Sequence, residues 1–158
     1  MAPHPHGQVA LIRLTPDLAA YILLTLLGLW ALADHFAPHA GMSDAGCRIG
    51  YVYDGDTVEL VCGGVPETAR LVGFDAPEVK SPRCPEEKAL GLQATQRLRG
   101  VLMAVDIGIS DLGFDKYQRR LVRVMVGGRD VAAIMVAEGL AVAYSGGTRI
   151  DWCARING

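Results

Sequence analysis

The sequence predicts an α+β fold, in which a small and mostly antiparallel β-barrel carries packed helices. Three observations support this prediction: β-rich segments dominate from Cys47 onward, two segments with helical periodicity interrupt them, and turn-forming residues separate the elements. The resulting order of strands, helix, strands and helix is typical of domains that segregate their helices from an antiparallel sheet. The length of 158 residues suits one such domain with an N-terminal extension.

The first two predicted strands form a hairpin. They flank Asp54-Gly55-Asp56, and an Asp-Gly pair between two apolar runs is a strong signal for a tight turn. The last predicted strand ends at Gly127-Gly128. The five expected strands span residues 48–53, 57–62, 67–74, 105–110 and 120–126.

Two helices are predicted, over residues 85–103 and 131–138. Pro85 suits the first turn of the longer helix, in which apolar residues recur every four positions. Asp130 can cap the start of the shorter helix, and Gly139 can end it. The apolar stripe of the longer helix consists of Leu90, Ala94, Leu98 and Leu102.

An uncharged apolar block over residues 18–33 precedes the predicted domain. It is short for a membrane span, which needs about 20 apolar residues, and near the upper limit of a signal-peptide core, about 7–15 residues. Ala31-Leu32-Ala33 provides a small-x-small cleavage signal, so a cleaved signal peptide and an uncleaved anchor both stay open, with a buried core helix as a third alternative. The first two place the domain outside the cytoplasm. The expected division is a signal peptide or anchor over 1–33, a linker over 34–46 and the folded domain over 47–158.

All four cysteines lie within the predicted domain. An even number of cysteines in an exported domain predicts two disulfides. Cys47 and Cys62 lie symmetrically about the predicted turn, so a hairpin would place them opposite each other, and Cys84 would then pair with Cys153. Four buried free thiols are the alternative. A zinc site is not indicated, because the sequence has no C-x-x-C motif and no histidine near these cysteines.

The composition excludes several classes of enzyme. The four histidines all precede the domain, which excludes Ser-His-Asp catalysis, Cys-His catalysis and histidine-ligated zinc hydrolases; they are His4, His6, His35 and His39. Glycine-rich phosphate-binding motifs are absent as well. The net charge of −2 argues against a non-specific DNA coat protein, and less strongly against an enzyme that binds few phosphates. An enzyme built on this domain must use carboxylates, Arg, Lys and Tyr, with or without a metal ion.

Two acidic clusters fit that requirement, and each has a purely structural alternative. Asp54 and Asp56 offer two carboxylates on one turn to a hard cation, although Asp-Gly pairs are also common in hairpin turns that bind nothing. Arg70 lies within an apolar strand, where its charge is costly unless it is used or reaches water from the strand edge. Asp75 and Glu78 follow at the end of that strand, on a turn stiffened by proline.

A third cluster, which includes Arg119, is a basic loop before a strand, and its structural alternative is an ordinary solvated loop. Together the three clusters fit one chemistry. Asp56 and Asp75 can hold Ca²⁺ or Mg²⁺, which prefer oxygen ligands, and Glu78 can orient or deprotonate a water molecule. Arg70 and Arg119 can neutralise the charge on a phosphate, because a planar guanidinium donates two parallel hydrogen bonds.

In this order and spacing, the clusters resemble the staphylococcal nuclease (thermonuclease) family. The resemblance covers roughly residues 47–144 and rests on three motifs: Asp54-Gly55-Asp56-Thr57, Arg70 with Asp75-Ala76-Pro77-Glu78, and Asp115-Lys116-Tyr117-Gln118-Arg119. It implies an OB-fold-like five-stranded barrel with packed helices. It also implies a Ca²⁺-dependent nuclease that hydrolyses DNA, RNA or both, preferentially in single-stranded regions.

The resemblance further implies a role for individual residues. The implied catalytic residues are Arg70 and Arg119, which would stabilise the phosphate, and Glu78, which would activate water. The implied Ca²⁺ ligands are Asp56, Asp75 and the backbone carbonyl of Ala76, supported by Asp54. The implied nucleotide-binding residues are Lys116, Tyr117 and Tyr144.

The sequence also departs from the family pattern. It ends at Gly158, so the family's third helix is expected to be missing, with a Cys84–Cys153 bond in its place. Its acidic balance lowers the affinity and salt tolerance expected for phosphate contacts. The alternative to a secreted or periplasmic, monomeric nuclease is a non-catalytic OB-type module that binds nucleic acid or protein, tethered to the membrane through residues 18–33.

Overall fold

The computed structural model of the chain describes residues 15–36 and 46–158, and of residues 31–36 it describes the backbone alone. The side chains of the predicted cleavage signal and most of the predicted linker over 34–46 lie outside the described residues. So do the side chains of the four histidines. The chain divides into two compact units, Met1–Ala37 and Pro38–Gly158.

The first unit contains one described helix, α1 (Pro16–Phe36). Its described side chains are exposed, including large apolar ones such as Leu24 and Trp30. Among the helices in the described residues, none combines the length and the hydropathy needed to cross a membrane.

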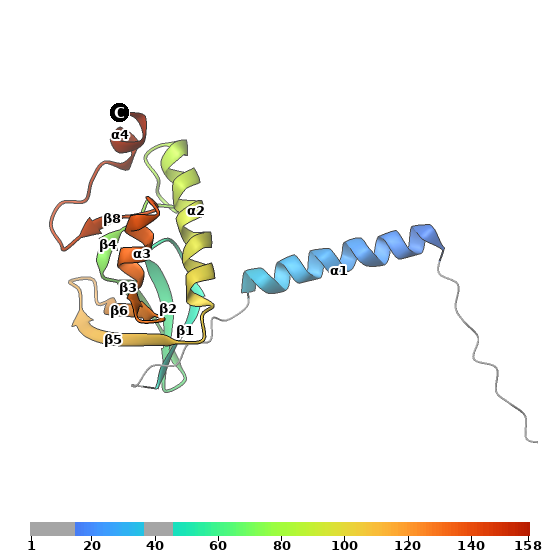
Figure 1. Ribbon diagram of the computed structural model, residues 1–158, viewed down its shortest axis with the longest axis horizontal. Coiled ribbons are helices and arrows are strands. Elements are labelled where there is room, and N and C mark those ends of the chain that lie inside the picture. The colour runs from blue at the N-terminus through green and yellow to red at the C-terminus, as the bar shows by residue number, and fades with distance from the viewer. Residues whose placement is uncertain (1–14, 37–45) are drawn as a thin grey trace, which may run out of the picture. The chain divides into compact units, whose positions relative to one another are not determined.

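The second unit is built on a curled sheet that forms a half-barrel (Figure 1). Its strands follow the order β1-β2-β3-β6-β5, and neighbouring strands are antiparallel except for β3 and β6, which are parallel. The bounds are β1 (Cys47–Val52), β2 (Thr57–Cys62), β3 (Val65–Leu71), β5 (Ile107–Phe114) and β6 (Arg120–Val126). A short strand, β7 (Arg129–Asp130), pairs with β6, while β4 (Gly73–Asp75) and β8 (Val142–Tyr144) form a separate two-stranded sheet. The α+β barrel-like fold predicted from the sequence is confirmed.

The predicted third strand, residues 67–74, is two strands in the structure. Gly73 has a φ of +95°, a conformation that glycine adopts without strain, and a Cβ there would lie 3.0 Å from the Cβ of Ala132. The chain therefore turns at this point, so that β3 stays in the main sheet and β4 leaves it to pair with β8. The strand predicted over 105–110 is also displaced: β5 begins later and continues to Phe114, next to the basic loop.

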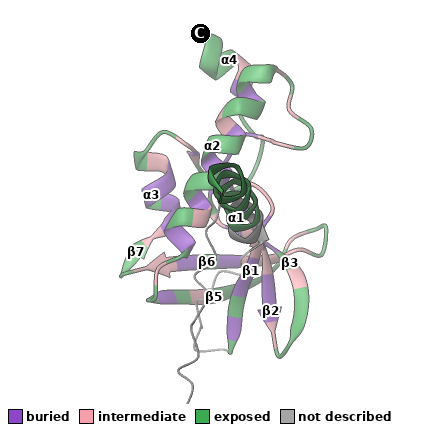
Figure 2. Cartoon of the chain, turned by 90° about the vertical axis from the view of Figure 1, so that its right-hand side faces the viewer, coloured by how far each residue is buried: buried purple, intermediate pink, exposed green. Residues whose placement is uncertain are grey.

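Two helices cover the sheet and enclose the core, α2 (Pro85–Leu102) and α3 (Val131–Ala137) (Figure 2). Of the predicted apolar stripe of α2, Leu90 is only partly buried and the rest is inaccessible to solvent: Ala94, Leu98 and Leu102. Burying one leucine side chain contributes about 1.5–3 kcal/mol. The packing of this stripe on the sheet therefore holds α2 against the half-barrel.

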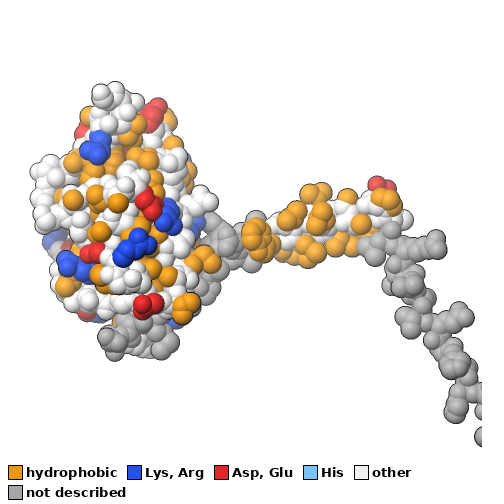
Figure 3. Space-filling view, in the orientation of Figure 1, with side chains coloured by type: hydrophobic (Ala, Val, Ile, Leu, Met, Phe, Trp, Pro, Cys, Tyr) orange, Lys and Arg blue, Asp and Glu red, His pale blue; other side chains and the backbone are white. Residues whose placement is uncertain are grey.

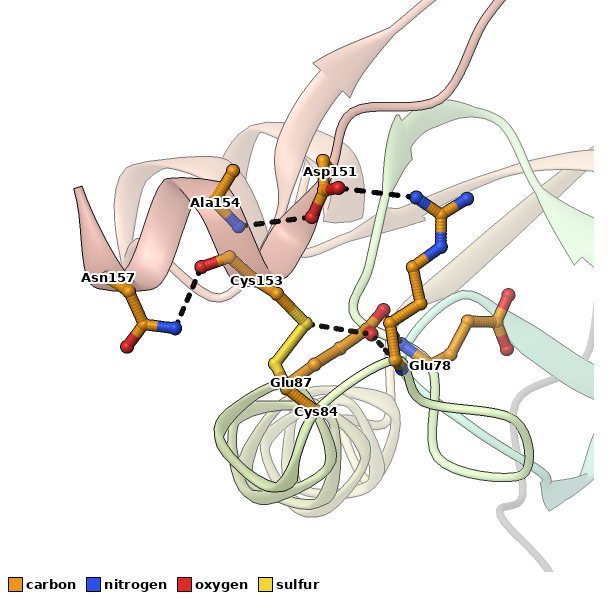
Figure 4. Close-up of a disulfide and its surroundings, with 8 residues drawn as sticks. Glu78, Cys84, Glu87, Asp151, Cys153, Ala154 and Asn157 are labelled. Atoms are coloured by element: carbon orange, nitrogen blue, oxygen red, sulfur yellow. Dashed lines mark hydrogen bonds and ion pairs between the residues drawn. A yellow bond between two sulfur atoms is a disulfide. The ribbon is translucent and has the colours of Figure 1, made fainter.

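The last residues form an arm, called here the C-terminal arm (residues 145–158), which ends in a short helix, α4 (Trp152–Asn157). This helix was not predicted from the sequence, and it follows α3, the second helix predicted for the domain. Asp151 provides the helix start that periodicity did not reveal, because its side chain accepts a hydrogen bond from the Ala154 amide at 3.0 Å. A disulfide joins Cys153 on α4 to Cys84, the residue before α2 (Figure 4).

The second disulfide joins Cys47 to Cys62. These two residues are register partners at the open ends of β1 and β2, where the antiparallel ladder brings their Cα atoms to 4.2 Å. Both disulfides of the domain therefore involve the pairs that hairpin geometry and elimination suggested.

Candidate active site

A cleft of about 1030 Å³ lies between the β1–β2 turn, β3, the β5–β6 loop and the C-terminal arm. Most of the residues predicted for the site line it: Asp54, Asp56, Arg70, Glu78, Lys116, Tyr117, Arg119 and Tyr144. Asp75 and Ala76 do not line the cleft, being 0% and 3% exposed. Segments far apart in the sequence thus contribute to one site.

The β1–β2 turn brings Asp56 against the chain after β4. A Cβ on Gly55 would lie only 2.6 Å from the Cβ of Ala76, so glycine is needed for this close approach. As a result, the Ala76 amide donates to Oδ2 of Asp56 at 3.4 Å, and the Thr57 hydroxyl donates to Oδ1 at 2.9 Å. Asp54 shapes the turn, because its Oδ1 accepts a hydrogen bond from the Asp56 amide at 3.1 Å.

Arg70 joins the two predicted metal-binding carboxylates. Its Nη2 lies 2.9 Å from Oδ2 of Asp56 and 3.1 Å from Oδ1 of Asp75. The Arg70 side chain is 13% exposed, so it does not extend along the strand edge to water. The positive charge of Arg70 within an apolar strand therefore has a structural role, because it compensates the charges of two buried carboxylates.

Burial changes the proton affinity of Asp56. Desolvation raises the pKa of this carboxyl from 3.8 to about 6, and the negative charge of Asp54 acts in the same direction. The positive charge of Arg70 and the hydrogen bonds from Thr57 and Ala76 oppose the shift without cancelling it. Asp56 is thus a carboxylate that a cation near the cleft would stabilise further.

Sequence reasoning missed Arg149, on the C-terminal arm. Its guanidinium contacts three groups: Nε lies 2.5 Å from Oδ1 of Asp75, Nη2 donates to the carbonyl of Ala76 at 3.1 Å, and Nη1 pairs with Glu78. Burial alone would lower the pKa of Arg149, but the hydrogen bonds with Glu78 and Asp75 outweigh it and hold the pKa above its usual range. No local signal marks this residue, since its partners lie more than seventy positions earlier.

Trp152, on the same arm, was also not predicted. Its indole N–H donates to Oδ2 of Asp75 at 3.1 Å, and the side chain is buried against the domain. The two oxygens of Asp75 are thus both engaged, one by Arg70 and Arg149 and the other by Trp152.

Glu78 is held by its backbone as well as by the contact of its side chain with Arg149. Glu87, a buried acid in the first turn of α2, accepts hydrogen bonds from the amides of Glu78 at 3.3 Å and Arg83 at 2.6 Å (Figure 4). This closes the loop before α2. The side chain of Glu78 stays 35% exposed, where water can reach it.

Arg119 belongs to a loop that is held together by hydrogen bonds to the Asp115 side chain. Asp115 accepts hydrogen bonds from the amides of Tyr117 at 2.8 Å and Arg119 at 2.9 Å, and its other oxygen pairs with the Arg119 guanidinium at 2.7 Å. Gln118 adopts a φ of +62° within this turn. Arg119 lines the same cleft as Arg70, although its salt bridge within this loop is to Asp115 rather than to Asp56 or Asp75.

The predicted nucleotide-binding residues flank the two arginines. The Tyr117 ring lies near Lys116 and Arg119, at 5.0 Å and 5.6 Å, and is mostly exposed. Tyr144 lies 5.9 Å from the guanidinium of Arg70 and donates its hydroxyl hydrogen to the Gly147 carbonyl at 2.8 Å. On the face of the domain shown in Figure 3, basic and acidic side chains are interspersed among apolar ones, in keeping with the net charge of −2.

The donor set fits a hard divalent cation. Oxygens of Asp56, Asp75 and Ala76 contact the guanidinium groups of Arg70 and Arg149, so these oxygens are already arranged to stabilise positive charge. The carboxylates of Asp56, Asp75 and Glu78 do not by themselves form a close three-ligand group. Across residues 15–30 and 46–158, the only such group of three is Cys84, Glu87 and Cys153, whose ligand atoms lie within 4.8 Å of one another. Both of its sulfur atoms are used in the disulfide.

Comparison with known proteins places this site in context. The pattern of the staphylococcal nuclease homologue family matches residues 68–151, just over half of the chain. The match includes Arg70, Asp75, Glu78 and Arg119, and also Arg149. The Asp54–Thr57 turn precedes it.

Several curated proteins are similar to the chain. Protein ParB of Escherichia coli is 32% identical over 102 residues, which cover 59% of this chain and 54% of ParB. Micrococcal nuclease of Shigella flexneri is 28% identical over 144 residues, 85% of this chain and 72% of that protein. Endonuclease YncB of Bacillus subtilis is 36% identical over 98 residues, 58% of this chain and 44% of YncB. The chain thus spans about half the length of two of these three relatives.

Proposed function

The chain belongs to the staphylococcal nuclease homologue family, and on that premise we propose that it is a Ca²⁺-dependent endonuclease that hydrolyses phosphodiester bonds of DNA, RNA or both. The observation that carries the proposal is that Asp56, Glu78, Arg70 and Arg119 line one cleft, while Arg70 also binds the buried carboxylate of Asp75. Relatives named as micrococcal nuclease and endonuclease support the same activity.

Each of these residues has a role that its surroundings favour. Asp56, Asp75 and the carbonyl of Ala76 would hold Ca²⁺, which when bound neutralises charge on the substrate phosphate. Glu78 is accessible to water and held at its backbone, so it can accept the proton of an attacking water molecule.

The two arginines act on the phosphate. Arg70 and Arg119 reach the cleft from β3 and from the β5–β6 loop, and each can donate paired hydrogen bonds to phosphoryl oxygens. Their charge stabilises the transition state more than the ground state, because negative charge accumulates on those oxygens during attack.

Substrate binding follows from the same cleft. Tyr117 exposes its ring beside Lys116, and Tyr144 lies against Arg70, so bases of a single strand can stack while the backbone meets cationic groups. Stacking of this kind needs unpaired bases, which supports a preference for single-stranded substrate.

We further propose that the domain acts outside the cytoplasm. The proposal is supported by the apolar N-terminal block and by two disulfides, which persist in oxidising compartments. Expression in an intact cell, followed by a thiol-labelling and fractionation experiment, tests it: a cytoplasmic protein with four free thiols contradicts it.

Cleavage of a fluorogenic single-stranded oligonucleotide by the full chain, with Ca²⁺ and with a chelator, tests the activity. We expect cleavage that stops with the chelator and returns with excess Ca²⁺. Binding of the oligonucleotide without cleavage at saturating Ca²⁺ would instead identify a non-catalytic module.

Two substitutions test the assigned roles. Glu78→Gln should lower kcat by about 10²–10⁴-fold, because a general base is lost, and Arg119→Ala by about 10²–10³-fold, because a transition-state donor is lost. Glu86→Gln and Arg129→Ala change the same charges at exposed positions and should leave kcat unchanged. Full activity of both test variants contradicts the mechanism.

A further inference from the structure

Arg149 occupies the place that the proposed mechanism gives to a divalent cation. Its single guanidinium contacts Asp75 and the Ala76 carbonyl, two of the three proposed Ca²⁺ ligands, and also Glu78, the proposed base. The contact with Asp75 is through Oδ1, the oxygen that Arg70 also binds. An amino-acid side chain thus supplies positive charge where an ion would supply it.

We propose that Arg149 is a built-in competitor of the metal ion: the C-terminal arm inserts its guanidinium among Asp75, Ala76 and Glu78, and Ca²⁺ binds productively only when the arm withdraws it. The inference rests on the proposed function, because it assumes that these oxygens bind the catalytic ion. It adds that the nuclease is restrained by its own C-terminal arm.

Charge balance favours exclusion of one cation by the other. Asp56, Asp75 and Glu78 with Arg70 alone carry a net charge of −2, which a divalent ion neutralises. With Arg149 in place the net charge is −1, and the ion would lie beside a second guanidinium at hydrogen-bonding range of the same oxygens. Like charges a few ångströms apart in a partly buried site repel each other strongly, because little water lies between them to screen the interaction.

The same contacts also restrain the base. Oε1 of Glu78 pairs with Nη1 of Arg149, so the guanidinium occupies the oxygen to which an attacking water molecule would donate. Withdrawal of Arg149 therefore frees a ligand oxygen and the base in one movement.

The C-terminal arm is attached on both sides of Arg149, so the guanidinium can leave the carboxylates and still remain close to them. Upstream, Gly146 and Gly147 have φ values of +110° and +95°, and downstream Cys153 is bonded to Cys84. A tether at both ends keeps the local concentration of the guanidinium high, which strengthens its competition with a free ion. The arm then returns when the ion dissociates.

A calorimetric titration of the full chain with Ca²⁺ tests the proposal without any substrate. Arg149→Gln should tighten Kd on the order of tenfold, the factor expected if the guanidinium leaves the site free in about one molecule in ten. Arg155→Gln removes the same charge from an exposed position of the same arm and should change Kd by less than about twofold. Arg149→Lys keeps the charge but lacks the planar fork, and should give an intermediate Kd.

Trypsin cleavage of the unmodified chain provides a second measurement. Bound ligands usually protect a protein from proteolysis, but here Ca²⁺ should speed cleavage of the Arg149–Ile150 bond, because the arm is displaced. This assay needs no variant and so stays informative if Arg149→Gln fails to fold.

The outcomes separate the two proposals. An Arg149→Gln protein with unchanged or weaker Ca²⁺ affinity, or Ca²⁺-induced protection of the Arg149–Ile150 bond, overturns the competition and makes Arg149 a positioning or phosphate-binding residue. Absence of Ca²⁺ binding in every variant overturns the proposed metal dependence itself. If the unmodified chain does not cleave the oligonucleotide but still shows Ca²⁺ binding that depends on Arg149, only the proposed nuclease activity is overturned.

Discussion

The half-barrel and the C-terminal arm hold their parts of the site in different ways. In the half-barrel, the backbone ladder and the β1–β2 turn set the positions of Asp56 and Arg70, with glycine at the point of closest approach. In the C-terminal arm, Arg149 is positioned mainly by side-chain contacts and by one disulfide. Backbone structure thus holds Asp56 and Arg70 in place, whereas Arg149 depends on side-chain contacts and on a segment tethered by a disulfide.

The two disulfides show the same contrast. Cys47–Cys62 links residues that the β1–β2 ladder already pairs, 15 positions apart. Cys84–Cys153 links residues 69 positions apart, between the start of α2 and α4, where no strand ladder joins the segments. Both constrain the unfolded chain, but only the second is the covalent attachment of the C-terminal arm.

Removing each disulfide is the largest perturbation of this comparison. In the chain-entropy description, Cys84→Ser with Cys153→Ser should lower the free energy of unfolding by about 4 kcal/mol, because the loop it closes is long. Cys47→Ser with Cys62→Ser, the matched control, should lower it by about 3 kcal/mol. Urea denaturation of both double variants gives the two values.

The same two double variants distinguish attachment of the C-terminal arm from a general effect on the stability of the domain. Only loss of Cys84–Cys153 should also tighten Ca²⁺ binding, because the arm and Arg149 lose their tether. Equal Ca²⁺ affinities in the two double variants would show that the disulfide does not attach the arm to the site.

The pH dependence of Ca²⁺ binding distinguishes the contribution of Asp56, in the half-barrel, from that of Arg149, in the C-terminal arm. Because the pKa of Asp56 is about 6 in the ion-free protein, a proton must leave before the ion binds at lower pH. Affinity should be constant above about pH 7 and fall roughly tenfold per pH unit below about 6. Calorimetric titrations at a series of pH values from above 7 to well below 6 measure the slope.

Two variants assign that slope. Asp56→Asn should bind Ca²⁺ weakly and without the slope, whereas Arg149→Gln should shift the whole curve and keep it, because the pKa of Arg149 lies far above this range. A slope that survives Asp56→Asn would place the titrating group elsewhere. In the ion-free protein, Asp56 affects the pH dependence of folding stability in the direction opposite to most acids, because folding raises its pKa from 3.8. Its contribution to stability therefore grows as the pH falls through 6 and is lost as the pH rises.

The helix caps provide the smallest test. Asp130 starts α3 by accepting from the Ala132 amide at 2.9 Å, and α3 packs into the core, so Asp130→Ala should lower the free energy of unfolding by about 1 kcal/mol. Asp151→Ala removes the equivalent bond of α4 in the arm and should have a smaller effect, because α4 is short and largely exposed. Urea denaturation of both variants measures the difference, and a larger effect at Asp151 would mean that α4 supports the domain.

Much of the domain could be predicted from the sequence because the signals are local. The hairpin around Asp54-Gly55-Asp56, the long helix from Pro85 and the short helix after Asp130 follow from turn chemistry and periodicity within a few residues. The division of residues 67–74 into two strands could not be predicted, because it depends on the space left by Ala132, nearly sixty positions later.

By itself, the sequence determined the even set of cysteines, the helices α2 and α3, and the candidate residues Asp56, Asp75, Glu78, Arg70 and Arg119. Only the tertiary structure decided that Arg70 bridges Asp56 and Asp75, that Trp152 binds the same carboxylate, and that Arg149 lies on the proposed ion ligands. The physical reason is that hydrogen bonds and charge pairing act over a few ångströms in space. Arg149 belongs to no periodic pattern or motif that reveals which distant carboxylates it will contact.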